Sequence, residues 1–168
     1  ILELGSGTST DLFARYANQH KAKFTSLEES EEWLALTKST LAECGVSTVG
    51  TVKLTHASRV DTPHGSAYKF HDYEKYDFLY IDGPTVLQSE GKKLPNQDVV
   101  QIFSENIYPD TIAVDGRHST VDFIRETAPK GMYKIRYSSL YLAANPKYIL
   151  KQINLFQYHR TSVFIKNR

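Results

Sequence analysis

The sequence is poor in cysteine, in long apolar runs and in net charge. Its single cysteine, Cys44, excludes an internal disulfide framework and a cysteine-rich zinc site. A chain with so little cysteine is expected in a reducing, cytoplasmic setting. No apolar run approaches the roughly 20 residues that a membrane span needs, and no signal peptide is recognisable. We therefore expect no membrane partner.

The charges of the chain nearly cancel, with a formal net charge of +1 over 168 residues. Nothing in this balance calls for nucleic acid or an anionic membrane as a partner. The sequence also has no basic stripe with interleaved aromatic residues, which is a common footprint of nucleic-acid binding. A small-molecule substrate is the expectation, and the oligomeric state stays open.

The length fits one domain spanning residues 1–168. The chain has no initiator methionine and begins inside the first predicted strand, so we expect elements that precede this strand to be absent. Strand-like and helix-like segments alternate, which is typical of α/β proteins. We predict a doubly wound, mostly parallel seven-stranded sheet with helices on both faces and an antiparallel last strand. Its strands are expected at residues 1–4, 23–27, 49–57, 76–81, 111–114, 132–137 and 162–166.

Three further expectations concern the segments between these strands. Residues 58–74 contain Pro63 and Gly65 and are expected to be mostly loop. Residues 85–94 are likewise expected to form a loop. Trp33 follows the predicted helix cap Ser30 and is expected in the core beneath the second helix.

Four predicted strands end in an acidic residue beside a turn. In an open parallel sheet, ligands bind beyond the carboxyl ends of the strands. Four such ends therefore predict one polar crevice. The residues concerned are Glu3 with Gly5, Glu28, Asp82 with Gly83, and Asp115 with Gly116.

The first of these strand ends is the most informative, because two glycines follow the acidic residue. A glycine lets a ligand approach the backbone closely. A loop that cradles phosphate has no use for the buried carboxylate of Glu3, whereas a cationic ligand does. A nicotinamide-binding loop normally has a third glycine three positions after Gly7, and Thr10 stands there.

This Glu-x-Gly-x-Gly pattern, with an acidic residue at the end of the second strand, resembles the class I S-adenosylmethionine-dependent methyltransferases. The order of elements agrees over nearly the whole chain. The resemblance implies a Rossmann-like transferase domain with S-adenosylmethionine as its cofactor. It also implies methyl transfer to an acceptor, for which we expect an oxygen or nitrogen of a small molecule.

The resemblance further implies which residues bind the cofactor. Vicinal ribose hydroxyls suit a carboxylate acceptor, and Glu28 matches that position, with Glu29 as its rival. The end of the third strand would meet the adenine, and the end of the fourth would face the methyl group. The cofactor-binding set is then Glu3, Gly5, Ser6, Gly7, Thr8, Glu28, Glu29, Ala57, Ser58 and Asp82.

Asp82 and His118 are the candidates for catalysis, since either can take a proton from an acceptor hydroxyl or amine. Arg117 could orient a carboxylate or phosphate of the substrate. Asp82 and Asp115 also stand where catechol-type O-methyltransferases hold a divalent cation. Gly116 replaces the asparagine of that site, so the oxygen cage would be one ligand short. We assign no metal ligand.

Two other functions stay open. A methyltransferase-like domain could have lost catalysis and serve as a binding scaffold, because fold does not dictate function. Another Rossmann-like enzyme using a different nucleotide is the second alternative. The segment Asp82-Gly83-Pro84-Thr85 stands where amine methyltransferases of nucleobases and glutamine carry Asn-Pro-Pro-aromatic. This difference disfavours those acceptors.

Overall fold

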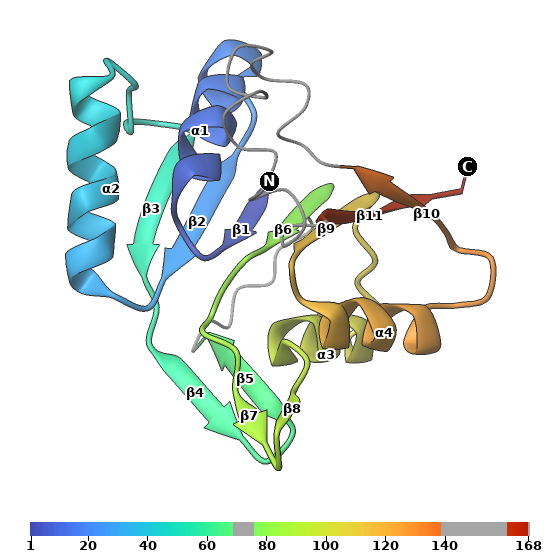
Figure 1. Cartoon of the computed structure of the whole chain (residues 1–168). Helices are drawn as coiled ribbons and strands as arrows, with labels where there is room; N and C mark the ends of the chain where they lie inside the picture. The colour runs from blue at the N-terminus through green and yellow to red at the C-terminus, as the bar shows by residue number, and fades with distance from the viewer. Residues whose placement is uncertain (69–75, 139–160, 168) are drawn as a thin grey trace, which may run out of the picture.

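A seven-stranded sheet forms the centre of the computed structural model, which describes residues 1–68, 76–138 and 161–167 (Figure 1). The strand order is β10-β11-β9-β6-β1-β2-β3. All neighbouring strands are parallel except at β11, which is antiparallel to both β9 and β10. The strands are β1 (Leu2–Leu4), β2 (Phe24–Glu28), β3 (Val52–His56), β6 (Phe78–Ile81), β9 (Thr111–Asp115), β10 (Tyr133–Ser138) and β11 (Thr161–Lys166).

Helices cover both faces of this sheet because buried strand residues alternate between two apolar layers. Leu79 and Ile81 face one layer with helices α3 and α4, while Tyr80 faces the other with α1. The helices are α1 (Thr8–His20), α2 (Glu31–Glu43), α3 (Gln97–Ser104) and α4 (His118–Thr127). The predicted doubly wound fold with its antiparallel last strand is confirmed.

Two segments that were expected to be loops contain short hairpins instead. One hairpin pairs β4 (Arg59–Thr62) with β5 (Gly65–Tyr68), and the other pairs β7 (Gln88–Ser89) with β8 (Lys92–Lys93). Both follow the carboxyl ends of sheet strands, β3 and β6, and Figure 1 draws both beyond that end of the sheet. A Cβ on Gly65 would lie 2.0 Å from the Pro95 carbonyl oxygen. Packing against a distant segment therefore holds the β4–β5 hairpin in place. The local sequence pattern does not reveal such a contact.

Trp33 was predicted to be a core residue, and this prediction is wrong. Its side chain is 48% exposed, and α2 buries Leu34, Thr37 and Leu41 instead. The indole Nε1 donates to the main-chain oxygen of Ser6 at 2.8 Å. Trp33 thus braces the turn after β1, because it lies one residue off the buried stripe of its helix.

The described helices include none that is both long enough and apolar enough to cross a membrane.

Candidate functional site

The turn between β1 and α1 contains two glycines whose surroundings differ. Gly5 has φ +92°, and a Cβ there would lie 2.7 Å from the Gly83 nitrogen. Main-chain packing against Gly83 therefore requires glycine at position 5. Gly7 has an extended φ of 172°, and a Cβ there would meet nothing within 4 Å. The space beside Gly7 is open.

Glu28 holds this turn from the end of β2. Its Oε2 accepts hydrogen bonds from the Ser6 amide at 2.9 Å and from Ser6 Oγ at 3.0 Å. Its Oε1 accepts the Ser30 amide at 2.9 Å, which also fixes the entry to α2. These bonds use three of the about four acceptor positions of a carboxylate. Because Glu28 is buried, its carboxylate fixes the conformation of the turn, and the turn fixes the orientation of the carboxylate.

Glu3 lies beneath the turn and is fully buried. Three hydroxyl groups donate to its carboxylate: Ser9 Oγ at 2.6 Å, Thr10 Oγ1 at 2.7 Å and Ser26 Oγ at 2.6 Å. Burial raises the pKa of Glu3 to about 7, although these hydrogen bonds act in the opposite direction. Thr10 Oγ1 also accepts the Gly7 amide at 2.8 Å. Glu3 thus supports the first turn of α1 from below.

The residues predicted to lie near the adenine follow β3. The Ala57 amide donates to the main-chain oxygen of Glu28 at 2.9 Å, and the side chain of Ala57 is buried. Ser58 is exposed beside it, as is Thr8 at the start of α1. His56 Nε2 lies 3.0 Å from the main-chain oxygen of Glu29. This part of the predicted site is assembled by the parallel pairing of β2 with β3.

Glu29, the rival of Glu28, contacts the loop after β6. Its Oε1 accepts hydrogen bonds from the Thr85 amide at 2.8 Å and from Thr85 Oγ1. The two residues are 56 positions apart in the sequence. Because β1 lies between β2 and β6, this contact passes over the end of β1.

Asp82 follows β6 and Asp115 is the last residue of the neighbouring parallel strand β9, yet their side chains have different surroundings. The Asp82 side chain is 51% exposed, with Arg117 Nη2 4.0 Å from its Oδ1. Asp115 Oδ1 accepts a hydrogen bond from Thr161 Oγ1 at 3.1 Å, which ties Asp115 to β11. Within residues 1–68, 76–138 and 161–167 there is no group of three or more histidine, cysteine or acidic side chains suited to hold a metal ion.

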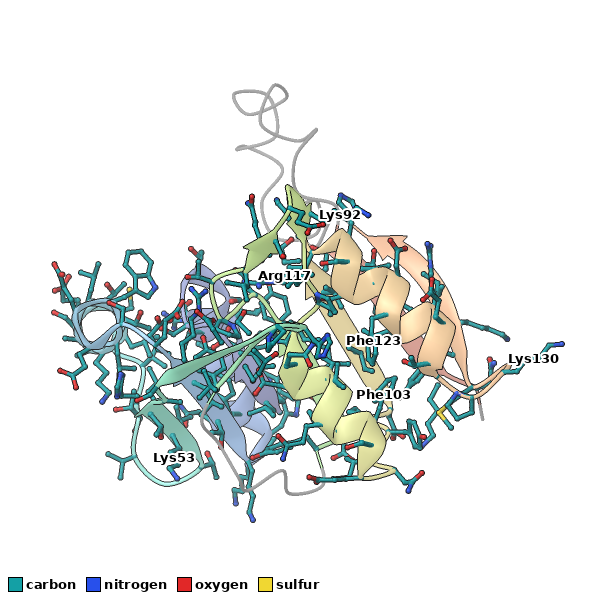
Figure 2. The ribbon with its side chains drawn as sticks, turned by 90° about the horizontal axis from the view of Figure 1, so that it is seen from below. Lys53, Lys92, Phe103, Arg117, Phe123 and Lys130 are labelled. Carbon is teal, nitrogen blue, oxygen red and sulfur yellow. The ribbon has the colours of Figure 1, made fainter. Side chains whose placement is uncertain are left out.

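Arg117 holds the loop after β6 and is itself largely buried, with 10% of its side chain exposed. Its Nη2 donates to the main-chain oxygen of Asp82, and its Nη1 donates to that of Pro84 at 2.7 Å. Among the described residues its buried Nε has no hydrogen-bond partner. Burial lowers the pKa of the guanidinium. Figure 2 shows Arg117 near the start of α4, and His118 is the exposed first residue of that helix.

Three residues that sequence reasoning missed complete this end of the sheet. The Tyr68 hydroxyl oxygen would lie 2.2 Å from a Cβ on Gly83. Asp98 is fully buried and accepts the Tyr68 amide at 3.1 Å. Asn96 Nδ2 donates to the Gly83 oxygen at 2.8 Å. Only the capping role of Asn96, which accepts the Val99 amide, leaves a signal in the sequence.

A cavity of about 410 Å³ lies at the opposite edge of the sheet. Asp77 and Asp110, which line it, directly precede β6 and β9. Lys166, also in its wall, donates to the Tyr108 oxygen at 3.2 Å and lies 3.8 Å from Asp110. This cavity is therefore separate from the acidic strand ends.

Comparison with solved structures identifies the fold as that of the class I methyltransferases. A Clostridium thermocellum protein described as an rRNA-methylase superposes with a TM-score of 0.57 at 10% identity, over 99% of this chain and 88% of that one. The methyltransferase domain of a bacterial CtHen1 gives 0.55 at 14% identity, over 99% and 89%. The N-terminal domain of human METTL16 in complex with SAH gives 0.53 at 13%, over 98% and 60%.

No protein-family model matches the sequence, and no curated protein is similar enough to it to count as a match. At these identities the likeness to solved structures concerns the fold. It agrees with the predicted resemblance, since the strand order, the glycine turn after β1 and the acidic strand ends all occur together in this chain.

Proposed function

We propose that this chain is an S-adenosylmethionine-dependent methyltransferase that acts on an oxygen or nitrogen of a small molecule. The observation that carries the proposal is the turn at Gly7, which is open on one side and held on the other by the carboxylate of Glu28. The methyltransferase fold supports the same conclusion. The single cysteine, Cys44, supports a cytoplasmic setting for the enzyme.

The side chains at the carboxyl ends of the strands fit the cofactor chemically. The cofactor carries a sulfonium and an ammonium group, and the strand ends supply the carboxylates of Glu28, Glu29 and Asp82 around a turn in which Gly5 and Gly7 have no side chain. Carboxylates are also suitable acceptors for ribose hydroxyls. In this proposal Gly5, Ser6, Gly7 and Thr8 line the methionine part, Glu28 and Glu29 hold the ribose, and Ala57 and Ser58 lie near the adenine. Glu3 supports the turn from beneath.

When bound, S-adenosylmethionine supplies an activated methyl group on a positively charged sulfur. The chain then has to position the acceptor and remove a proton from it. Asp82 is suited to accept this proton at its carboxylate, because it follows β6 and half of its side chain is exposed. His118 is the second candidate base, at the exposed start of α4. Arg117 is engaged with main-chain oxygens, so it serves in this proposal as a support for Asp82 and makes no contact with the substrate.

An RNA acceptor is the second candidate, because one structural neighbour is described as an rRNA-methylase. The charges of this chain favour the small molecule. The strand ends present Glu29, Asp82 and Asp115 beside the largely buried Arg117, and such an acidic edge repels the phosphates of a polynucleotide. Methyl transfer from labelled S-adenosylmethionine to phenols, amines and total RNA separates the two candidates. Labelling of RNA alone would contradict the small-molecule proposal.

Cofactor binding is tested by calorimetry with S-adenosylhomocysteine on three proteins. Gly7→Ala adds one methyl group in open space and keeps a backbone that any residue adopts. It should leave the fold intact and weaken binding at least about tenfold, because the methyl group occupies the place of the cofactor. Ser39→Ala, on the exposed side of α2, is the matched control and should bind like the wild type.

Two binding results would contradict the proposed cofactor. The first is equal affinity of wild type and Gly7→Ala for S-adenosylhomocysteine. The second is binding of a nicotinamide dinucleotide in its place, which would favour another Rossmann-like enzyme. Binding without methyl transfer to any acceptor would favour the scaffold alternative.

A further inference from the structure

The segment 82–85 after β6 is held by side chains along its entire main chain. Its four successive carbonyl oxygens each accept a hydrogen bond from a side chain of another element. Arg117 donates to the oxygens of residues 82 and 84, Asn96 to that of residue 83, and Ser66 to that of residue 85. These donors come from the start of α4, the cap of α3 and strand β5. The position of the segment is therefore set by its surroundings.

The segment lies directly on the predicted cofactor turn. Gly83 and Gly5 pack so closely that a Cβ on either would come within 2.7 Å of a backbone atom of the other. Beyond this contact the segment reaches β2, where Thr85 donates two hydrogen bonds to Glu29 Oε1. The segment thus passes over the end of β1, and hydrogen bonds to Glu29, just after β2, hold its last residue.

The two hydrogen-bond donors of Thr85 resemble those of a ribose. Thr85 offers an amide hydrogen and a hydroxyl hydrogen, side by side, to one carboxylate oxygen. A ribose offers two vicinal hydroxyl hydrogens to a carboxylate, and a ribose bound in a bidentate way needs both oxygens of that carboxylate, Oε1 included. Oε1 has two lone pairs, and Thr85 fills both. Glu29 cannot hold Thr85 and a ribose at this oxygen at the same time.

We propose that Thr85 competes with the cofactor for Glu29. Its two hydrogen bonds to Glu29, which we call the latch, hold segment 82–85 in place, and the ribose of the cofactor displaces them. The inference rests on the proposed function. The latch is releasable because Thr85 is exposed and Glu29 is half-buried, so water can solvate both groups after they separate. The other four bonds of the segment involve more buried partners and stay in place.

Calorimetry with S-adenosylhomocysteine on variants at the two ends of the contact tests the latch. Thr85→Val removes the hydroxyl donor and keeps the shape and the amide, so affinity should rise about fivefold, the factor for one exposed hydrogen bond. Glu29→Gln removes the charged acceptor, so affinity should fall by a similar factor or more. Thr127→Val is the matched control, since the Thr127 hydroxyl bonds to the Phe123 oxygen within α4.

The opposite signs distinguish a latch from a contact that merely supports the fold. A supporting contact would weaken binding from both ends, and that result would overturn the inference. Unchanged affinity of Thr85→Val would overturn it as well. Neither outcome bears on the proposed function as long as the wild type binds S-adenosylhomocysteine and Gly7→Ala binds it at least about tenfold more weakly. Loss of binding in the wild type itself would contradict both.

Amide hydrogen exchange of the wild type provides a test without any substitution. The Thr85 amide is hydrogen-bonded to Glu29, so it should exchange slowly in the protein alone. Saturation with S-adenosylhomocysteine should accelerate its exchange at least about threefold, while ligand binding ordinarily slows exchange nearby. Slower or equal exchange in the presence of the ligand would show that Thr85 remains on Glu29.

Discussion

Replacing Glu3 with glutamine should change how the stability of this protein depends on pH. Glu3 is fully buried, and its pKa is raised by burial from 4.5 in the unfolded chain to about 7 in the folded protein. The folded state therefore binds the proton more tightly than the unfolded state. The stabilisation that comes with this proton is complete below pH 4.5 and is lost as the pH rises through 7.

The expected magnitude follows from the two pKa values. Each pKa unit corresponds to about 1.4 kcal/mol. The rise from 4.5 to about 7 therefore corresponds to about 3 kcal/mol of unfolding free energy lost between acidic pH and pH 8. Glu3→Gln keeps the shape and a polar partner for the hydroxyls of Ser9, Thr10 and Ser26, and it does not titrate.

Urea unfolding of both proteins at pH 5 and pH 8 measures this difference. The wild type should lose about 2 to 3 kcal/mol more than Glu3→Gln between the two pH values. Glu126→Gln, at an exposed site of α4, is the control and should follow the wild type. A difference below about 0.5 kcal/mol between wild type and Glu3→Gln would refute the reasoning. The Glu3 carboxylate would then ionise as it does in the unfolded chain.

Three further substitutions test the packing around the site, each by urea unfolding. Gly5→Ala should destabilise by at least about 2 kcal/mol, because φ is +92° and the Cβ would strike the Gly83 backbone; an unchanged midpoint would contradict this contact. Asn96→Ala should cost about 2 kcal/mol, since the α3 cap and the bond to Gly83 are both lost; Gln101→Ala, on the same helix, should cost under about 0.5 kcal/mol. Ile124→Ala should cost about 2 to 5 kcal/mol, because Ile124 is fully buried between α4 and the sheet; a cost below about 1 kcal/mol would show that α4 is loosely packed.

The strands and the order of the fold could be predicted because they rest on local patterns. The short apolar run at β1 and the longer one at β6 are each followed at once by a turn signal. The carboxyl ends of parallel strands lie at a common edge of the sheet, so an acidic residue at such a strand end can be placed there from the sequence. Glu28 is an example, since the predicted strand end and the observed one differ by a single residue.

The roles of individual site residues could be predicted less well, because neighbours from distant parts of the chain decide them. Arg117 was a candidate to orient a carboxylate or phosphate of the substrate, and its guanidinium bonds to main-chain oxygens after β6. Trp33 was expected in the core, and it braces Ser6 at the surface. Asp115 stands at the predicted strand end, but the hydroxyl of Thr161 engages it. None of these partners lies within ten positions of the residue it holds.

The sequence by itself determined the parallel α/β architecture, the glycine turn after β1 and the acidic character of the strand ends. Each of these follows from spacing within one short segment. Only the tertiary structure decided that Gly5 is required by Gly83, that both hairpins form beyond the sheet, and that Thr85 reaches Glu29. The physical reason is that these contacts join segments far apart in the chain, whose meeting depends on the packing of the whole sheet.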